Sequence, residues 1–175
     1  MYEVEVKVRA DHDAVRGALA AVGAEPGETV EQADTYYDAP HREFAETDEA
    51  LRVRRVSADG ETEARVTYKG PKVDAKSKTR EEIETGVADG DDAAAICEAL
   101  GFSPAATVEK TRTYYALADY TVVLDDVDGL GEFVEVETES ADVEAAREGA
   151  FKVLRSLGLD PGEQVRTSYL GLLIE

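Results

Sequence analysis

Residues 2–9 alternate strictly between apolar and charged side chains. The charged positions are Glu3, Glu5, Lys7 and Arg9. A period of two is typical of a β-strand, whose successive side chains point to opposite faces of a sheet. This strand therefore has one apolar face and one entirely ionic face. Any fold of the chain has to place the ionic face in water or against groups that neutralise it.

Seven further segments have strand-like patterns, and three segments have the periodicity and end signals of helices. The predicted strands after the first cover about 30–37, 51–56, 63–69, 79–85, 107–116, 119–126 and 132–138. The predicted helices cover about 11–22, 91–100 and 142–157, and the last ten residues look like a short amphipathic helix. The polar stretch 70–79 is expected to be a mobile loop. Eight strands with a few helices predict an α+β fold with a mostly antiparallel sheet.

The later strands repeat the division into an apolar and an ionic face. Their polar positions on the ionic side are Arg52, Arg54, Arg65, Thr67, Lys69, Arg80, Glu82, Glu84, Lys110, Arg112, Tyr114, Asp125, Glu135 and Glu137. An open sheet with one face in water is the simplest explanation for any single strand. The chain carries a net charge of −20, however, so a solvent face should be overwhelmingly acidic. Nine of the nineteen basic residues lie on these positions or on the charged face of residues 2–9 instead. The set therefore favours a closed eight-stranded barrel with a charged lumen and helices packed outside.

The ionic face has the composition of a site for metal ions and phosphates. Two carboxylates at positions i and i+2 of a strand lie roughly 6.5–7 Å apart on one face. With oxygens from another strand they can hold hard cations such as Mg²⁺ or Mn²⁺. Rows of arginine and lysine supply the contacts that phosphoryl oxygens accept. So many cations exceed the needs of one monophosphate, and a polyphosphate chain is the expected guest.

The chain contains an internal repeat. Residues 21–37 align without a gap on residues 99–115, with nine identities in seventeen. A Glu-x-Glu strand precedes each copy. The repeat predicts one domain over residues 1–175, built from two similar halves of about 1–78 and 79–175.

Composition excludes several classes of protein. A net charge of −20 argues against nucleic acid or an anionic membrane as partner, because both need a broad basic field. A single cysteine excludes an internal disulfide framework and a zinc site built of cysteines. No signal peptide and no apolar run of roughly 20 residues is present, which predicts a cytoplasmic protein. The spread of carboxylates indicates a surface adapted to high salt, with an ordinary acidic cytosolic protein as the alternative.

Taken in order, the motifs resemble those of the CYTH superfamily, the triphosphate tunnel metalloenzymes, which includes class IV adenylyl cyclases and thiamine triphosphatases. The matching motifs are Glu3-x-Glu5-x-Lys7, DTYYD at 34–38, LRVR with Arg52 and Arg54, YKGP with Lys69, Arg80-x-Glu82-x-Glu84, Lys110-x-Arg112, LDDV with Asp125, and GEFVEVE with Glu135 and Glu137. The resemblance covers nearly the whole chain and implies an eight-stranded tunnel that binds Mg²⁺ or Mn²⁺ and a triphosphate.

The resemblance also implies roles for single residues. The metal side would consist of Glu3, Glu5, Asp125, Glu135 and Glu137. The phosphate contacts would come from Lys7, Arg52, Arg54, Lys69, Arg80, Lys110 and Arg112. Glu82 and Glu84 lie on the same ionic face and would orient the cations. Tyr36 and Lys69 match a pair implicated in activating water, and Glu5 is expected to be essential for catalysis.

By resemblance the chain is closest to the class IV adenylyl cyclase branch, because of the stretch GLGEFVEVE and the tail SYLGLL at 168–173. The expected reaction is conversion of ATP to cyclic AMP and pyrophosphate. One alternative is hydrolysis of thiamine triphosphate, a nucleoside triphosphate or inorganic tripolyphosphate. A second is a non-catalytic module that binds polyphosphate or a nucleotide. A monomer or a homodimer is compatible with the sequence.

Overall fold

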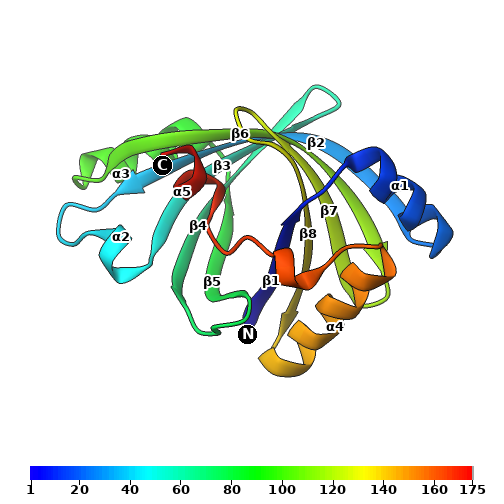
Figure 1. Ribbon diagram of the computed structural model, residues 1–175. Helices are drawn as coiled ribbons and strands as arrows, with labels where there is room; N and C mark the ends of the chain where they lie inside the picture. The colour runs from blue at the N-terminus through cyan, green and yellow to red at the C-terminus, as the bar shows by residue number, and fades with distance from the viewer. Residues whose placement is uncertain (175) are drawn as a thin grey trace.

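The computed structural model describes residues 1–174 and closes eight strands into an antiparallel barrel, as the alternation predicts (Figure 1). The strands are β1 (Tyr2–Arg9), β2 (Glu25–Asp38), β3 (Ala50–Ala58), β4 (Glu61–Lys72), β5 (Lys78–Val87), β6 (Ser103–Leu117), β7 (Tyr120–Val127) and β8 (Gly131–Ser140). Their order around the barrel is β1-β5-β4-β3-β2-β6-β7-β8. Every neighbouring pair is antiparallel. The predicted α+β fold with a closed barrel is confirmed.

The ionic faces of the strands point into the barrel, and the apolar faces point out. Val4, Val6 and Val8 are buried on the outside of β1, whereas Glu5 and Lys7 are buried within. The main apolar core therefore lies between the outer surface of the barrel and the helices. Its members include Val6, Val8, Val15, Leu19, Val122, Leu124, Val134, Val136, Ala150 and Leu154.

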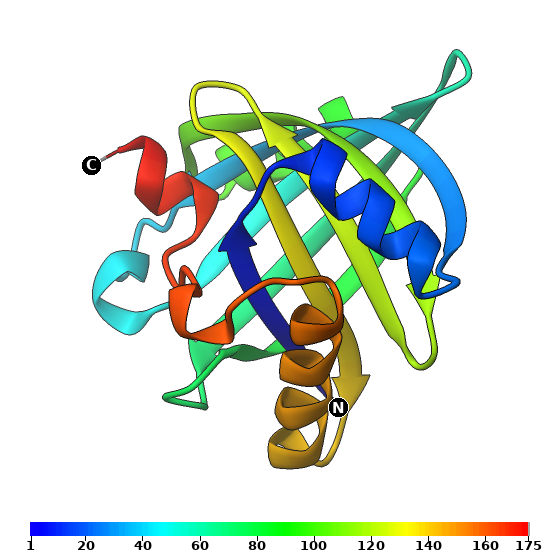
Figure 2. The same ribbon diagram turned by 45° about the vertical axis from the view of Figure 1, so that its right-hand side comes forward.

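The helices are α1 (His12–Ala21), α2 (Phe44–Thr47), α3 (Gly90–Ala99), α4 (Val143–Ser156) and α5 (Tyr169–Leu173), with a 3₁₀ turn η1 (Pro161–Glu163). The side chains of Asp11, Asp89 and Asp142 accept hydrogen bonds from the first turns of α1, α3 and α4. Helix α4 packs on β1 and β8, and α3 packs on β3, β4 and β6. Figure 2 shows α1 and α4 lying over the same side of the barrel.

The two copies of the repeat pair with each other as β2 and β6. In this pairing Thr29 lies opposite Thr113, and Thr35 lies opposite Thr107. Their hydroxyl oxygens are 3.0 and 3.3 Å apart. Thr29 and Thr107 are equivalent in the repeat, as are Thr35 and Thr113, so each copy contacts the other through the same two positions. The pairing has the local two-fold symmetry that an isologous contact requires.

The stretch 70–79 differs from the predicted loop. Strand β4 continues to Lys72 and β5 begins at Lys78, with a register shift between Lys69 and Lys72. The turn between the two strands is bound on several sides. Asp74 forms an ion pair with Arg147 of α4, at 3.1 Å, and its carbonyl oxygen accepts a bond from Arg166. A polar composition favours a loop, but here the polar groups bind this turn to the rest of the protein.

The C-terminal segment crosses the end of the barrel where this turn lies. The backbone N–H of Val165 donates to the carbonyl oxygen of Lys7 in β1. Gln164 and Arg166 donate to carbonyl oxygens of the 73–77 turn. Helix α5 then packs its apolar side chains against Val108, Val127 and Phe133. This confirms a short helix near the end of the chain, over Tyr169–Leu173, with Glu175 outside the described residues.

The acidic surface should make stability depend on salt. Raising KCl from about 0.1 to about 1 M shortens the screening length from about 10 to about 3 Å, which weakens repulsion among surface carboxylates. We expect the thermal midpoint at pH 7.5 to rise by about 5 °C or more. Thermal unfolding of the protein in EDTA, followed by circular dichroism, measures this midpoint. The gain should shrink near the isoelectric point, about pH 4.4. A midpoint that falls with KCl at pH 7.5 would contradict a self-repelling surface.

Candidate active site

The barrel encloses a cavity of about 560 Å³. Its lining consists of Glu3, Glu5, Tyr36, Arg52, Arg54, Arg65, Lys69, Lys78, Glu82, Glu84, Lys110, Arg112, Tyr114, Glu135, Glu137, Glu139 and Tyr169. Seven of these side chains are acidic, seven are basic and three are tyrosines. In a protein of net charge −20, this even balance separates the lumen from the acidic surface. The cavity is therefore a site with its own electrostatics.

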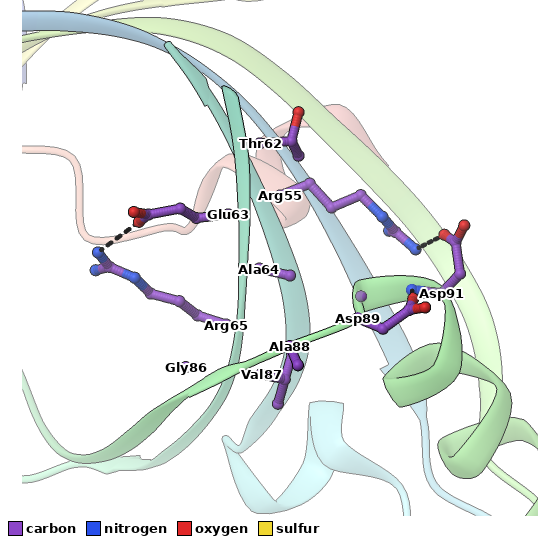
Figure 3. A pocket seen from close by; sticks show the side chains of 11 residues that line it. Arg55, Thr62, Glu63, Ala64, Arg65, Gly86, Val87, Ala88, Asp89 and Asp91 are labelled. Carbon is purple, nitrogen blue, oxygen red and sulfur yellow. Dashed lines mark hydrogen bonds and ion pairs between the residues drawn. The ribbon is translucent and has the colours of Figure 1, made fainter. Parts of the chain in front are cut away.

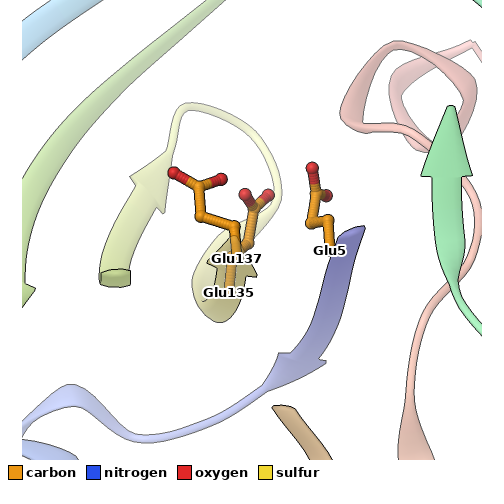
Figure 4. A group of neighbouring side chains, drawn as sticks. All are labelled: Glu5, Glu135 and Glu137. Atoms are coloured by element: carbon orange, nitrogen blue, oxygen red, sulfur yellow. The ribbon is translucent and has the colours of Figure 1, made fainter. Parts of the chain in front are cut away.

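Three carboxylates gather on one side of the lumen. Glu5 of β1 and Glu135 and Glu137 of β8 each offer an oxygen within 4.8 Å of the others. Figure 4 shows all three side chains pointing into the same space. We call this group the carboxylate cluster. It arises because β1 and β8 pair with Glu5 opposite Glu137, so that the inward positions of two strands adjoin.

The carboxylate cluster fits a hard divalent cation. All its donors are carboxylate oxygens, which Mg²⁺ and Mn²⁺ prefer. The pKa of Glu137 is raised to about 8 by burial and by the negative charges of Glu3, Glu135 and Glu5, against the opposing effect of Arg112. Burial also acts to raise the pKa of Glu5, but Lys78, Lys69 and Lys7 hold it well below its usual range. A divalent ion bound to the three carboxylates would supply positive charge and oppose this upward shift.

Lys69 lies between Glu3 and Glu82. Its Nζ is 3.0 Å from Glu3 Oε1 and 3.7 Å from Glu82 Oε2. Burial lowers the pKa of Lys69, but Glu3, Glu5 and Glu82 more than compensate and raise it well above its usual range. The pKa of Glu82 is raised to about 8 by burial and by the adjacent Glu3. In this arrangement the ammonium group of Lys69 lies between two carboxylates.

Two arginines of the lumen are held by buried aspartates. Arg54 donates to both oxygens of Asp34, at 2.7 and 2.8 Å. Arg112 donates to both oxygens of Asp125, at 2.7 and 2.6 Å, and its Nη2 lies 3.3 Å from Glu135. Such forked contacts fix the plane of each guanidinium group. They leave the other N–H groups able to face the lumen.

Arg52 is less completely satisfied than its neighbours. Its Nη2 lies 3.9 Å from Glu82 and 3.6 Å from Glu84, and its buried Nε has no hydrogen-bond partner in residues 1–174. Tyr36 lies beside it on the cavity wall and helps to raise the pKa of Arg52 against the effect of burial. Lys110 is 4% exposed, and burial with the charge of Arg112 lowers its pKa to about 8. Arg52 and Lys110 are thus buried cations with capacity for an anionic guest.

Three predicted site residues are absent from the cavity wall. Asp125 is fully buried and receives contacts from Arg112 and Tyr169, the latter through a hydroxyl at 2.8 Å. Lys7 donates to the carbonyl oxygen of Thr167, and its Nζ lies 4.1 Å from the Tyr169 ring centroid. Burial and the charge of Lys78 lower the pKa of Lys7 to about 7.

Arg80 is the third of these residues. It donates to the carbonyl oxygens of Asp48 and Gly70 and pairs with the Asp48 carboxylate at 3.1 Å. These contacts connect the loop before β3 to strands β4 and β5. Its guanidinium group is thus already bound to Asp48 and Gly70 in the ligand-free protein.

The structure adds residues that the sequence pattern did not single out. Lys78 lies on the cavity wall beside Glu5, Tyr169 caps the lumen from α5, and Asp34 orients Arg54. Lys78 continues the alternation of Arg80, which is a signal for an inward position, but it falls in the stretch expected to be a loop. No periodic signal points to Tyr169, because it reaches the lumen from a helix distant in sequence.

A larger hollow of about 890 Å³ lies on the surface where α3 begins, next to β3, β4 and β5. Figure 3 shows two ion pairs among its charged side chains, Arg55 with Asp91 and Arg65 with Glu63. These pairs are at the surface, where ion pairs contribute little. The lumen is therefore the better candidate for a chemical site.

The fold and the lumen define a β-barrel protein with an internal site of mixed charge. The family model of the CYTH domain matches residues 1–169, and the chain belongs to this family. Among the described residues, no helix has the length and apolarity needed to span a bilayer.

Individual relatives are similar over most of the chain. MJ0240 of Methanocaldococcus jannaschii, provisionally named an adenylate cyclase, is 38% identical over 98% of each chain. The adenylate cyclase CyaB of Aeromonas hydrophila is 31% identical over 77% of this chain and 68% of its own. The solved structure of PH1819 from Pyrococcus horikoshii superposes with a TM-score of 0.91, at 41% identity and 98% coverage of both chains.

The raised pKa of Glu137 gives a pH-dependent prediction. Between its ordinary pKa of 4.5 and its folded value of about 8, this carboxyl group takes up a proton on folding. Its contribution to the free energy of unfolding therefore falls as the pH rises through that range. We expect Glu137→Gln to be more stable than wild type by roughly 1–3 kcal/mol at pH 9, and to lose this advantage at pH 5.

Urea unfolding in EDTA at both pH values measures the difference. Glu139→Gln is the control, since Glu139 lies two residues further along β8 and is exposed. An equal effect of Glu137→Gln at pH 5 and pH 9 would show that the carboxyl group of Glu137 is not protonated on folding.

Proposed function

We propose that the protein is a metal-dependent enzyme that acts on a triphosphate inside the barrel. The observation that carries the proposal is the lumen wall, where three clustered carboxylates face arginines and lysines held in fixed positions. A metal–triphosphate complex carries both signs of charge, so it matches both parts of this wall. Mg²⁺ or Mn²⁺ is the proposed cofactor.

Roles for the residues follow from their contacts. Glu5, Glu135 and Glu137 would hold the metal, which when bound polarises and neutralises phosphoryl oxygens. Arg52, Arg54, Lys69, Lys110 and Arg112 would bind the phosphates. Glu3 and Asp125 lie beside the metal side but are paired with Lys69 and Arg112, so their proposed role is to fix these cations.

Lys7, Arg80 and Tyr36 have more limited roles in this proposal. Lys7 contributes its charge from beneath Tyr169, and Arg80 positions the loops at the end of the lumen. Tyr36 lies on the wall beside Arg52, where it can contact a bound phosphate. Glu82 and Glu84 hold Lys69 and Arg52 in orientation.

The reaction we favour is the conversion of ATP to cyclic AMP and pyrophosphate. The names of the relatives at 38% and 31% identity support it. In this reaction the ribose 3′-oxygen attacks the α-phosphorus, and pyrophosphate leaves. The wall would align the triphosphate and neutralise the charge on the leaving group, which are the two main sources of catalysis for such a displacement.

Hydrolysis of a triphosphate is the second candidate. Within residues 1–174, the cavity wall has fourteen charged side chains and three tyrosines, and no aliphatic side chain. Sites for organic ligands are mostly lined by apolar and aromatic groups. The wall therefore fits the inorganic part of a substrate, and tripolyphosphate would fill it without an organic group.

Product analysis separates the candidates. The purified protein is incubated with ATP, thiamine triphosphate or tripolyphosphate, with Mg²⁺ or Mn²⁺, at low and high KCl. Cyclic AMP with pyrophosphate supports the cyclase, and orthophosphate supports the hydrolase. Tight binding without product would support a binding module. If the protein neither binds nor turns over any of the three compounds, the proposal is refuted.

Glu5→Gln tests the metal side directly. We expect turnover to fall by about 100-fold or more, because the cluster loses one anionic ligand. We also expect the metal-free protein to lose about 1–3 kcal/mol of stability, since Lys78 would lose its ion-pair partner at 3.0 Å. Kinetics and urea unfolding are measured on the same samples.

Glu81→Gln is the matched control for Glu5→Gln, because Glu81 is exposed in β5, the strand that pairs with β1. It should retain both turnover and stability. Full metal-dependent turnover in Glu5→Gln would remove Glu5 from the proposed metal site.

A further inference from the structure

Lys78 is a cation of the lumen wall that is held by a single side-chain hydrogen bond. It is the first residue of β5 and lies opposite Glu5 of β1. Its Nζ is 3.0 Å from Glu5 Oε1, and within residues 1–174 this is its only ion pair. Arg54 and Arg112, in contrast, each bind an aspartate through two short hydrogen bonds. A single contact from a flexible lysine can be released without breaking a fork.

The partner of Lys78 belongs to the carboxylate cluster. Glu5 offers its oxygens to the same space as Glu135 and Glu137. The other cation in contact with the cluster is Arg112, which is already bound to Asp125 through both oxygens. Lys78 has no second carboxylate in the described chain. Its ammonium group therefore neutralises the cluster where a divalent ion would do so.

The backbone of Lys78 is fixed, so that only its side chain can move. Ser77 is fully buried, and its hydroxyl oxygen lies 2.6 Å from Asp74 and 2.7 Å from Thr79 Oγ1. Arg166 donates to the carbonyl oxygen of Ser77. Lys78 lines the same cavity as Lys69 and the arginines. A released ammonium group would therefore remain in the lumen, within the space that a phosphate chain would fill.

We propose that Lys78 is a placeholder cation, which neutralises Glu5 in the metal-free protein and is released by a bound divalent metal to contact a phosphate group. The proposal rests on the proposed function, because it takes the carboxylate cluster as the metal site. It makes Lys78 a positioning and binding residue. Metal and triphosphate then bind with positive coupling, since the metal frees a cation that the triphosphate uses.

Lys78→Met tests the proposal through two affinities that should change in opposite directions. Isothermal titration with Mn²⁺ alone should show binding about tenfold tighter than in wild type, because the competing charge is gone. Titration with tripolyphosphate at saturating Mn²⁺ should show binding about tenfold weaker, because one phosphate contact is lost. A residue with a merely structural role would weaken both.

Two further variants serve as controls. Lys72→Met removes a lysine that pairs with Asp48 at 2.9 Å and is absent from the cavity wall, and it should change neither affinity. Lys78→Gln removes the charge but keeps a hydrogen-bond donor to Glu5. It replaces Lys78→Met if circular dichroism shows that the latter does not fold, and the same two shifts are expected.

The two titrations also separate this inference from the proposed function. Mn²⁺ affinity is measured without triphosphate, so tighter Mn²⁺ binding by Lys78→Met supports the placeholder role even if wild type shows no turnover. Unchanged or weaker Mn²⁺ affinity in the variant overturns the inference, whatever the activity. Absence of Mn²⁺ binding in both proteins overturns it as well.

Discussion

The pairing of opposite charges inside the barrel is the interaction on which the rest of the structure depends. Removing an ion from water costs several kcal/mol, and a partner must compensate in a buried lumen. The forks of Arg54 with Asp34 and of Arg112 with Asp125 meet this requirement across adjacent strands. Because each fork joins strands that are neighbours in the barrel, closure and charge neutralisation come about together.

The ionic lumen moves the apolar core to the outside of the barrel. Val6 and Val8 of β1 pack with Val15 and Leu19 of α1 and with Leu154 of α4. The helices thus cover apolar faces that would otherwise be in water. Strands β1 and β8 contribute one face to this core and the other to the polar site, so the same strands serve the apolar core and the cavity of about 560 Å³.

The lumen is not equally neutralised throughout. Glu137 and Glu82 have raised pKa values near 8, because burial and neighbouring carboxylates act on them together. Arg52, whose Nη2 lies 3.9 Å from Glu82, keeps a buried Nε without a hydrogen-bond partner in residues 1–174. The protein is therefore short of positive charge at one place and of an acceptor at another. A guest that carries a cation and phosphoryl oxygens meets both needs, and this supports the proposed function.

The sequence by itself determined the barrel and the face on which each residue lies. Strict alternation determines which face of a strand each side chain lies on, so the inward positions of Glu5, Lys69 and Glu135 follow from the order of residues alone. Their division into a metal side and a phosphate side came from the family resemblance, and it remains a proposal. The repeat likewise identified the two segments that pair as β2 and β6.

Only the tertiary structure decided which inward residues meet. Alternation between the two faces does not distinguish Glu137, which joins the carboxylate cluster, from Asp125, which is bound by Arg112 and Tyr169. Alternation also does not predict that Arg80 forms an ion pair with Asp48, or that Lys78 forms one with Glu5. The physical reason is that these contacts depend on strand stagger, on side-chain reach and on segments distant in the chain. A period of two carries no information about any of them.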